Sequence, residues 1–133
     1  MVDFSCIIAG SRSVKDFDLV VRAIQTAPFY KDITEVVCGD AKGVDEMGAL
    51  WATHLNIPVK HFPADWNNLK AKGAVVKTGA YGKYNAHAGH DRNTKMVEYA
   101  DSIIAIVEGE RSDIDYLVED MQRRGKLVYV WEV

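Results

Sequence analysis

The stretch Phe4-Ser-Cys-Ile-Ile-Ala-Gly-Ser-Arg12 decides the fold class, because a short apolar run ends on a glycine that polar residues follow. A run of this length that contains β-branched residues is typical of a buried strand. Apolar residues then recur at helical spacing up to the helix-terminating Pro28: Phe17, Val20, Val21 and Ile24. The chain is therefore expected to begin with a strand and a helix that a glycine turn joins.

The same alternation continues along the rest of the sequence. Four further apolar runs are expected strands: Glu35–Cys38, Ile57–Phe62, Ser102–Val107 and Leu127–Trp131. Helical periodicity lies between them, over residues 44–55, about 90–99 and 114–121. Strands that alternate with helices predict a mostly parallel sheet, and continuous apolar runs indicate that both its faces are covered. We predict an α/β fold: a doubly wound three-layer α/β/α sandwich around five strands, whose order periodicity leaves open.

One long segment interrupts this alternation. Residues 63–89 are polar and rich in glycine, and they leave the carboxyl end of the third expected strand. Loops of this length are uncommon in compact domains and are usually functional or mobile. Because the 133 residues contain neither a repeat nor a linker, we expect a single domain over residues 1–133 with one long loop at about 63–89.

Composition and charge narrow the class of protein. The chain is 48% hydrophobic with a formal net charge of −3, and its apolar runs are far shorter than the roughly 20 residues that span a bilayer. The N-terminal residues have no basic region typical of a signal peptide. Cys6 and Cys38 lie inside apolar runs, so we expect buried, reduced thiols and a cytoplasmic location. The acidic balance argues against a nucleic-acid partner.

Small and polar residues follow the expected strands, at the edge where open α/β sheets bind ligands. Glycine lets a ligand approach backbone N–H groups closely, and a helix N-terminus favours an anion. Sixteen residues at this edge are therefore candidate ligand-binding residues. They are Gly10, Ser11, Arg12, Gly39, Asp40, Ala41, Lys42, Gly43, Asp45, Asp65, Trp66, Gly89, Arg92, Asn93, Gly109 and Ser112.

The side chains in this set favour a phosphorylated small molecule. Arg12, Lys42 and Arg92 can make charge-assisted contacts with phosphate or carboxylate. A base could stack on one of three aromatic residues: Trp66, Tyr81 or Tyr84. Asp45 and Asp65 suit ribose hydroxyl recognition or acid–base work. The alternative for Asp45 is charge complementarity at a helix N-terminus, and the alternative for Asp65 is a turn or cap.

Several standard motifs are missing from the sequence. Neither GxxxxGK[ST] nor a GxGxxG after the first two strands is present, which disfavours a P-loop enzyme and an ordinary dinucleotide site. His87 and His90 are three residues apart, but no cysteine or glutamate completes a ligand set. His54 and His61 are interpreted as ordinary helix and strand residues. The sequence thus predicts no metal site and no cofactor.

Taken together, five segments resemble the SLOG superfamily. They are Ile8–Arg12, Val37–Asp45, Phe62–Trp66, Tyr84–Met96 and Tyr99–Asp101. The chain is most similar to the YspA/YpsA-related domains of unknown function, which are common in bacteria and phages. More distant relatives include LOG-type phosphoribohydrolases, lysine decarboxylase-like proteins and DprA. The resemblance implies a Rossmann-like fold, a ligand edge for nucleotides or nucleotide-derived molecules and, by analogy, a homodimer or higher homo-oligomer.

The resemblance also identifies candidate catalytic residues. In the phosphoribohydrolases an arginine in a segment similar to residues 88–96 is catalytic, which corresponds to Arg92 here. Their loop after the fourth strand, Gly-Gly-x-Gly-Thr-x-x-Glu, binds phosphate and supplies a catalytic glutamate. The present Gly109-Glu-Arg-Ser-Asp-Ile-Asp115 lacks Gly-Thr and leaves Asp113 and Asp115 as substitute carboxylates. This departure weakens the prediction of an enzyme more than that of a binding protein.

Three functions follow from the sequence. The leading hypothesis is a domain that binds a nucleotide or nucleotide-derived phosphorylated ligand, as a sensor, a sequestering protein or part of nucleotide metabolism. The alternative is an enzyme that cleaves nucleoside monophosphates to free base and ribose 5-phosphate. A single-stranded DNA-binding module similar to DprA is the third, which the net charge of −3 disfavours.

Overall fold

A parallel five-stranded sheet forms the centre of the protein. The computed structural model describes residues 3–79, 82–109 and 112–133, without the side chain of Ser112. The strands of the sheet lie in the order β3-β2-β1-β6-β7, and every neighbouring pair is parallel. Their bounds are β1 (Ser5–Gly10), β2 (Glu35–Cys38), β3 (Val59–His61), β6 (Ser102–Val107) and β7 (Leu127–Glu132).

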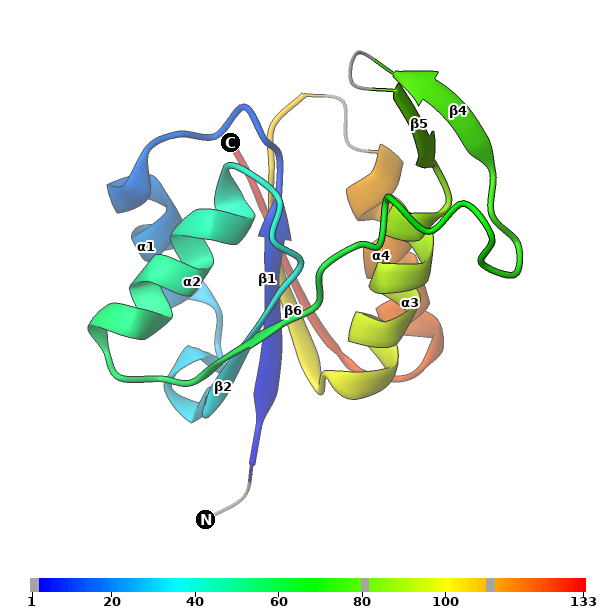
Figure 1. Cartoon of the computed structure of the whole chain (residues 1–133). Helices are drawn as coiled ribbons and strands as arrows, with labels where there is room; N and C mark the ends of the chain where they lie inside the picture. Colours follow the sequence, from blue (N-terminus) through cyan, green and yellow to red (C-terminus); the bar gives the residue numbers. More distant parts are fainter. Residues whose placement is uncertain (1–2, 80–81, 110–111) are drawn as a thin grey trace.

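Helices cover both faces of this sheet (Figure 1). One face carries α1 (Phe17–Thr26) and α2 (Val44–His54), and the other carries α3 (Ala88–Tyr99) and α4 (Ser112–Arg123). A short 3-10 helix, η1 (Tyr30–Asp32), precedes β2. The α/β fold and its Rossmann-like three-layer architecture are confirmed.

The buried strands explain why the sequence shows continuous apolar runs. Every residue of β1 and β6 is buried. Neighbouring side chains point to opposite faces of a strand, so Ile8 packs in the core beneath α1 and α2 while Ile7 packs in the core beneath α3 and α4. Two apolar cores therefore hold the three layers together.

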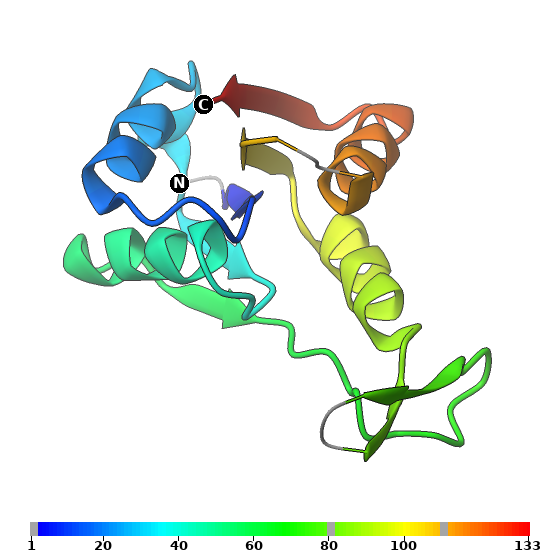
Figure 2. The same cartoon turned by 90° about the horizontal axis from the view of Figure 1, so that it is seen from above.

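The segment expected as a loop contains a second, smaller sheet. Strands β4 (Val76–Gly79) and β5 (Gly82–Asn85) pair in antiparallel fashion and join none of the five central strands. Figure 2 shows this hairpin projecting from the sandwich beyond the N-terminal end of α3. The hairpin was not predicted because its strands are short and mostly exposed, without a buried face that would impose an alternating apolar pattern.

The strand order reverses between β1 and β6. From β1 the chain adds β2 and β3 on one side, and later adds β6 and β7 on the other. In such sheets, the loops that follow the two central strands diverge and leave a crevice at the carboxyl edge. Here the buried Ser11 joins them, because its Oγ donates to the Glu108 carbonyl at 3.1 Å and accepts from the Glu108 N–H at 2.8 Å.

Within the described ranges, no helix has the length and apolar character needed to cross a bilayer.

Candidate functional site

A cleft of about 600 Å³ lies at the carboxyl edge, where the strand order reverses. This volume is in the range of small-molecule sites, roughly 300–1,000 Å³. Its walls come from the end of β1 and the loop after it, the start of α2, Trp66, α3 as far as Met96, Glu108 after β6 and the first half of α4. Segments that are distant in the sequence therefore converge on one site, as expected at the edge of a doubly wound sheet.

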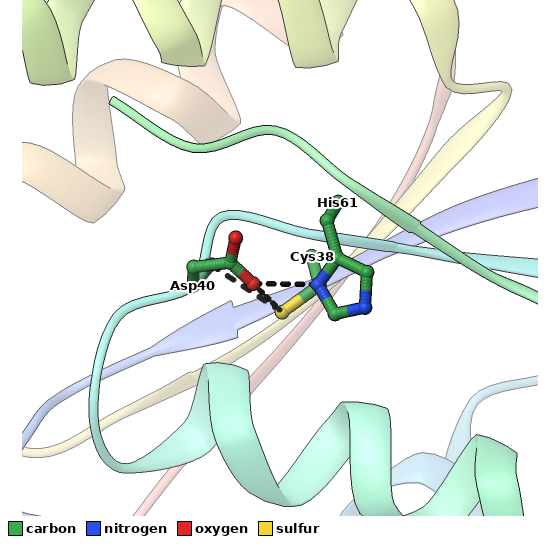
Figure 3. A group of neighbouring side chains, drawn as sticks. All are labelled: Cys38, Asp40 and His61. Carbon is green, nitrogen blue, oxygen red and sulfur yellow. Dashed lines mark hydrogen bonds and ion pairs between the residues drawn. The ribbon is translucent and has the colours of Figure 1, made fainter. Parts of the chain in front are cut away.

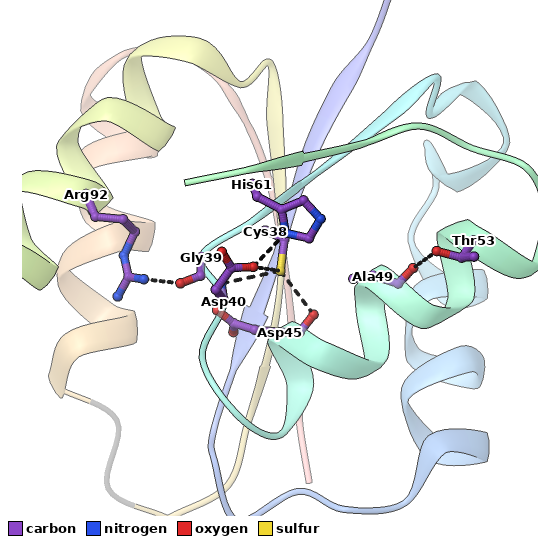
Figure 4. Close-up of polar contacts among 8 residues, drawn as sticks. All are labelled: Cys38, Gly39, Asp40, Asp45, Ala49, Thr53, His61 and Arg92. Carbon is purple, nitrogen blue, oxygen red and sulfur yellow. Dashed lines mark hydrogen bonds and ion pairs between the residues drawn. The ribbon is translucent and has the colours of Figure 1, made fainter. Parts of the chain in front are cut away.

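Two arginines contribute positive charge to this cleft, whose lining also includes the acidic residues Asp45, Glu108 and Asp113. Arg12 follows β1 and is exposed, whereas Arg92 on α3 is partly buried. Figure 4 shows the guanidinium of Arg92 donating through Nη1 to the carbonyl of Gly39, at the end of β2. Its Nε also donates to Asn93 Oδ1 at 2.8 Å. Arg92 is thus held between α3 and the turn after β2. Among the described residues, no hydrogen bond holds the side chain of Arg12 in the loop after β1.

Asp45 is the buried carboxyl group of the cleft. It lies in the first turn of α2 and is only 6% exposed. Burial raises its pKa to about 6, against lowering effects from the backbone of Ala41, the charge of Arg92, the backbone of Gly10 and the charge of Arg12. Because this pKa is close to neutral, the group can gain or lose a proton under ordinary conditions. A perturbed carboxyl in a cleft is typical of functional sites.

The glycines after the strands allow two parts of the chain to approach each other. A Cβ on Gly10 would lie 1.9 Å from the carbonyl oxygen of Ile106 on β6. Gly43 has φ +82°, and a Cβ there would lie 2.7 Å from the carbonyl oxygen of Ser11. The sequence pattern predicts that these glycines allow close approach of a ligand. Their first physical role is different, since they let the loops that frame the cleft converge.

The structure brings ten of the predicted residues to the cleft. They are Gly10, Ser11, Arg12, Ala41, Asp45, Trp66, Gly89, Arg92, Asn93 and Asp113. Seven others lie outside its lining as far as the described residues define it: Gly39, Asp40, Lys42, Gly43, Asp65, Gly109 and Asp115. The side chain of Ser112 lies outside the described part, as do Tyr81, Glu110 and Arg111. Contact with a ligand stays a prediction for the whole set.

Some of the predicted residues that do not line the cleft lie close to it and contact residues that do. Gly39 provides the carbonyl that accepts from Arg92. Asp65 lines a smaller cavity of about 130 Å³, which also touches Arg92. Among the aromatic candidates, Trp66 lines the main cleft, and Tyr84 packs against its edge with ring centroids 6.3 Å apart. Of the three aromatic candidates, Trp66 is therefore the one that the structure places to meet a ligand, and Tyr116, which the sequence pattern does not single out, lines the same cleft.

A cluster that the sequence pattern does not predict lies beside the cleft and is formed by Cys38, Asp40 and His61 (Figure 3). His61 Nδ1 lies 2.6 Å from Asp40 Oδ1, and Cys38 Sγ lies 3.6 Å from the same oxygen. Cys38 is a buried free thiol, as predicted, and burial raises its pKa to about 12. His61 was interpreted as an ordinary strand residue. The signal that could have linked them is the pairing of β2 with β3, which puts Cys38 opposite His61.

Comparison with known proteins finds a family match for about the first half of the chain. Residues 5–68 match the family model YAcAr, described as the YspA, cpYpsA-related SLOG family. The matched part, somewhat under half of the chain, includes Arg12, Asp45 and Trp66, and it ends before α3 and Arg92. A search of curated proteins and a search of solved structures each found no significant match.

Proposed function

Because residues 5–68 belong to the YspA, cpYpsA-related SLOG family, we propose that this protein binds a nucleotide or nucleotide-derived phosphorylated ligand in its cleft. Family membership is consistent with a nucleotide-related role. The observation that carries the proposal is the convergence of Arg12, Arg92 and the buried Asp45 on one cavity at the point of strand reversal. The ligand is a signal to be sensed, a molecule to be sequestered or an intermediate of nucleotide metabolism.

Guanidinium groups are the best supported phosphate ligands in this cleft. Arginine presents a planar fork of donors that matches phosphate oxygens. The helix N-termini offer less, because the first turns of α2, α3 and α4 all carry aspartate: Asp45, Asp91, Asp113 and Asp115. These carboxylates compete with a phosphate for the positive end of each helix. Arg12 and Arg92 are therefore the proposed phosphate-binding pair.

The remaining lining residues suit the other parts of a nucleotide. Asp45 accepts hydrogen bonds from ribose hydroxyls when it is ionised. Trp66 is 40% exposed and offers a ring face on which a base can stack. These assignments give each part of the ligand a chemically matched partner.

Calorimetric titration tests this function directly. Mono-, di- and cyclic nucleotides are titrated into the purified protein and into Arg12→Ala. We expect saturable binding of one nucleotide class and at least about a tenfold weaker affinity in Arg12→Ala, since a charge-assisted pair is lost. Arg22→Ala on α1 is the matched control, because Arg22 is exposed and does not line the described cleft. Absence of binding by every class at millimolar concentration would overturn the proposal.

One observation favours a second candidate function, the hydrolysis of an N-glycosidic bond. Asp113 and Arg92 line the same cleft, and Asp45 has a pKa near neutral. In such a reaction water attacks C1′ of the ribose, the bond to the base breaks, and the departing base takes up a proton. Asp113 is the type of residue that takes the proton from the attacking water, and Asp45 is the type that gives a proton to the departing base.

Chromatography separates this enzyme from a binding protein. The protein is incubated with nucleoside monophosphates, and free base is measured beside the Asp113→Asn and Arg92→Ala variants. Release of base that both variants lose supports the enzyme. No release by the unmodified protein, or release that neither substitution changes, rejects it.

A further inference from the structure

We propose that Cys38, Asp40 and His61 form a Zn²⁺-binding site on the sheet edge next to the cleft. The three side chains offer one sulfur, one oxygen and one nitrogen donor, and these atoms all lie within 4.8 Å of one another (Figure 3). None of the three residues lines the described cleft. The inference is independent of the proposed nucleotide function, because it rests on a different group of side chains.

The central sheet itself positions the three donors. Cys38 and His61 are partners in the register of the parallel strands β2 and β3. Asp40 follows two residues after Cys38 in the left-handed region, with φ +60°. This turn brings its backbone N–H to 3.4 Å from Cys38 Sγ and places its carboxylate between the thiol and the imidazole. Two adjacent strands and one turn thus fix the geometry without help from distant segments.

The mixture of donor atoms selects the class of metal. Mg²⁺ and Ca²⁺ prefer oxygen ligands alone, whereas a thiolate combined with an imidazole is typical of Zn²⁺. Tetrahedral bonds of about 2.0–2.3 Å put neighbouring donors roughly 3.3–3.6 Å apart. The separation of 3.6 Å between Cys38 Sγ and Asp40 Oδ1 already meets this. His61 Nδ1 and Asp40 Oδ1, at 2.6 Å, must separate by less than roughly 1 Å.

Exposure of the cluster leaves room for that movement and for a further ligand. The side chains of His61 and Asp40 are 56% and 39% exposed, whereas Cys38 is only 2% exposed. The buried sulfur is therefore the ligand on the protein side of the ion, and the two exposed donors bind it from the solvent side. As the Zn–S bond forms, the thiol proton passes to solvent. Water completes the fourth position, an arrangement typical of open zinc sites.

The cluster also has a simpler interpretation, as a surface histidine–aspartate pair above a buried thiol. That pair accounts for the short contact between His61 and Asp40. It also accounts for the sulfur facing the same oxygen, because the Cys38 thiol donates a weak hydrogen bond to Asp40 Oδ1, but it predicts no metal affinity. The two interpretations therefore differ in what metal titration should show.

Cobalt titration of the full chain tests the site, because Co²⁺ takes zinc ligands and is coloured. After treatment with a chelator, the protein is titrated with Co²⁺ and then with Zn²⁺. We expect one equivalent of Co²⁺ to produce sulfur-to-cobalt charge-transfer absorption and tetrahedral visible bands, which Zn²⁺ removes and excess Mg²⁺ does not. Absence of these bands at stoichiometric Co²⁺ would overturn the proposal.

Substitutions assign the ligands. Cys38→Ser should abolish the charge-transfer absorption. His61→Ala should lower the affinity for Zn²⁺ at least about tenfold, since removing even a residue that only supports a metal ligand typically lowers metal affinity about 10–100-fold. Because His61 is exposed, His61→Ala keeps the test valid if Cys38→Ser does not fold. Cys6→Ala and His54→Ala are the matched controls, and neither should change the titration. Unchanged Zn²⁺ affinity in His61→Ala, or equal loss in the controls, would reject the assigned ligands.

Discussion

Asp45 is a carboxyl group that the fold keeps from water beside two arginines. Its pKa of about 6, above the ordinary 3.8, means that the folded protein holds this proton more tightly than the unfolded chain. Stability therefore falls as pH rises from about 4 to about 6, and the cost, roughly 3 kcal/mol at most, is fully present above that range. We expect the free energy of unfolding of Asp45→Asn to be about 1–3 kcal/mol higher than that of the unmodified protein at pH 7, and to depend less on pH. Urea unfolding with a chelator present measures both.

Glu46→Gln is the control for this prediction. Glu46 shares the first turn of α2 but is exposed, so the substitution should leave both the stability and its pH profile nearly unchanged. If Asp45→Asn is instead less stable at neutral pH, the charges of Arg92 and Arg12 outweigh the cost of burial. A residue that destabilises the fold yet lines the cleft is the pattern expected of a functional group.

Arg92 should affect stability as well as binding, in contrast to Arg12. Arg92 donates to the carbonyl of Gly39 and to Asn93 Oδ1, so Arg92→Ala removes a bond within α3 and the bond that joins α3 to the turn after β2. We expect it to lose about 1–3 kcal/mol of unfolding free energy, whereas Arg12→Ala stays within about 0.5 kcal/mol of the unmodified protein. Urea unfolding compares the two variants. Equal stability of both would contradict the positioning of Arg92 by the fold.

At the scale of elements, Gly10 and Gly109 have different roles. Gly10 lies at a close contact between two strands, whereas Gly109 lies in a turn. Gly10→Ala forces a Cβ into the Ile106 carbonyl at the junction of β1 and β6, so we expect about 3 kcal/mol of destabilisation. Gly109 has φ +65°, and a Cβ there meets no described atom within 4 Å, so Gly109→Ala should cost only about 1–2 kcal/mol. Chemical denaturation of both variants measures the difference. A Gly10→Ala protein as stable as Gly109→Ala would contradict the close contact between β1 and β6, because relieving it would then cost no more than the backbone strain at Gly109.

The elements also show where sequence reasoning ends. Apolar periodicity predicted the central strands and the helices because burial imposes it along a single segment. Strand order depends on pairing between distant segments, so the sequence could place Cys38 and His61 on strands but could not make them neighbours. Polar residues after strands were correctly expected at one edge, since parallel strands share that edge. Whether each of them reaches the cleft depends on the fold of its loop, and Lys42, for example, is not among the described lining residues.

At the scale of the whole molecule, the protein divides into a sandwich and a projecting hairpin. The sandwich contains both apolar cores, whose buried residues all belong to the central sheet, its helices and their connections. Strands β4 and β5 contribute no residue to either core. The base of the hairpin is held by the buried Asn85, whose Oδ1 accepts from the N–H groups of Val75 and His87. Removing only the outer part should therefore leave the sandwich intact.

Replacing residues 77–84 by Asn-Gly tests this division. Val76 and Asn85 are cross-strand partners, and Asn-Gly is a favoured two-residue turn between antiparallel strands, so the base of the hairpin can close at that point. We expect the midpoint of thermal unfolding to change by less than about 3 °C, because the side chains removed from the described part are exposed or, for Tyr84, half-buried. Tyr84→Ala alone controls for the loss of its contact with Trp66. A fall of more than about 8 °C in the trimmed protein, but not in Tyr84→Ala, would make the hairpin part of the folding unit; an unchanged midpoint leaves the five-stranded sandwich as the structure that carries the cleft.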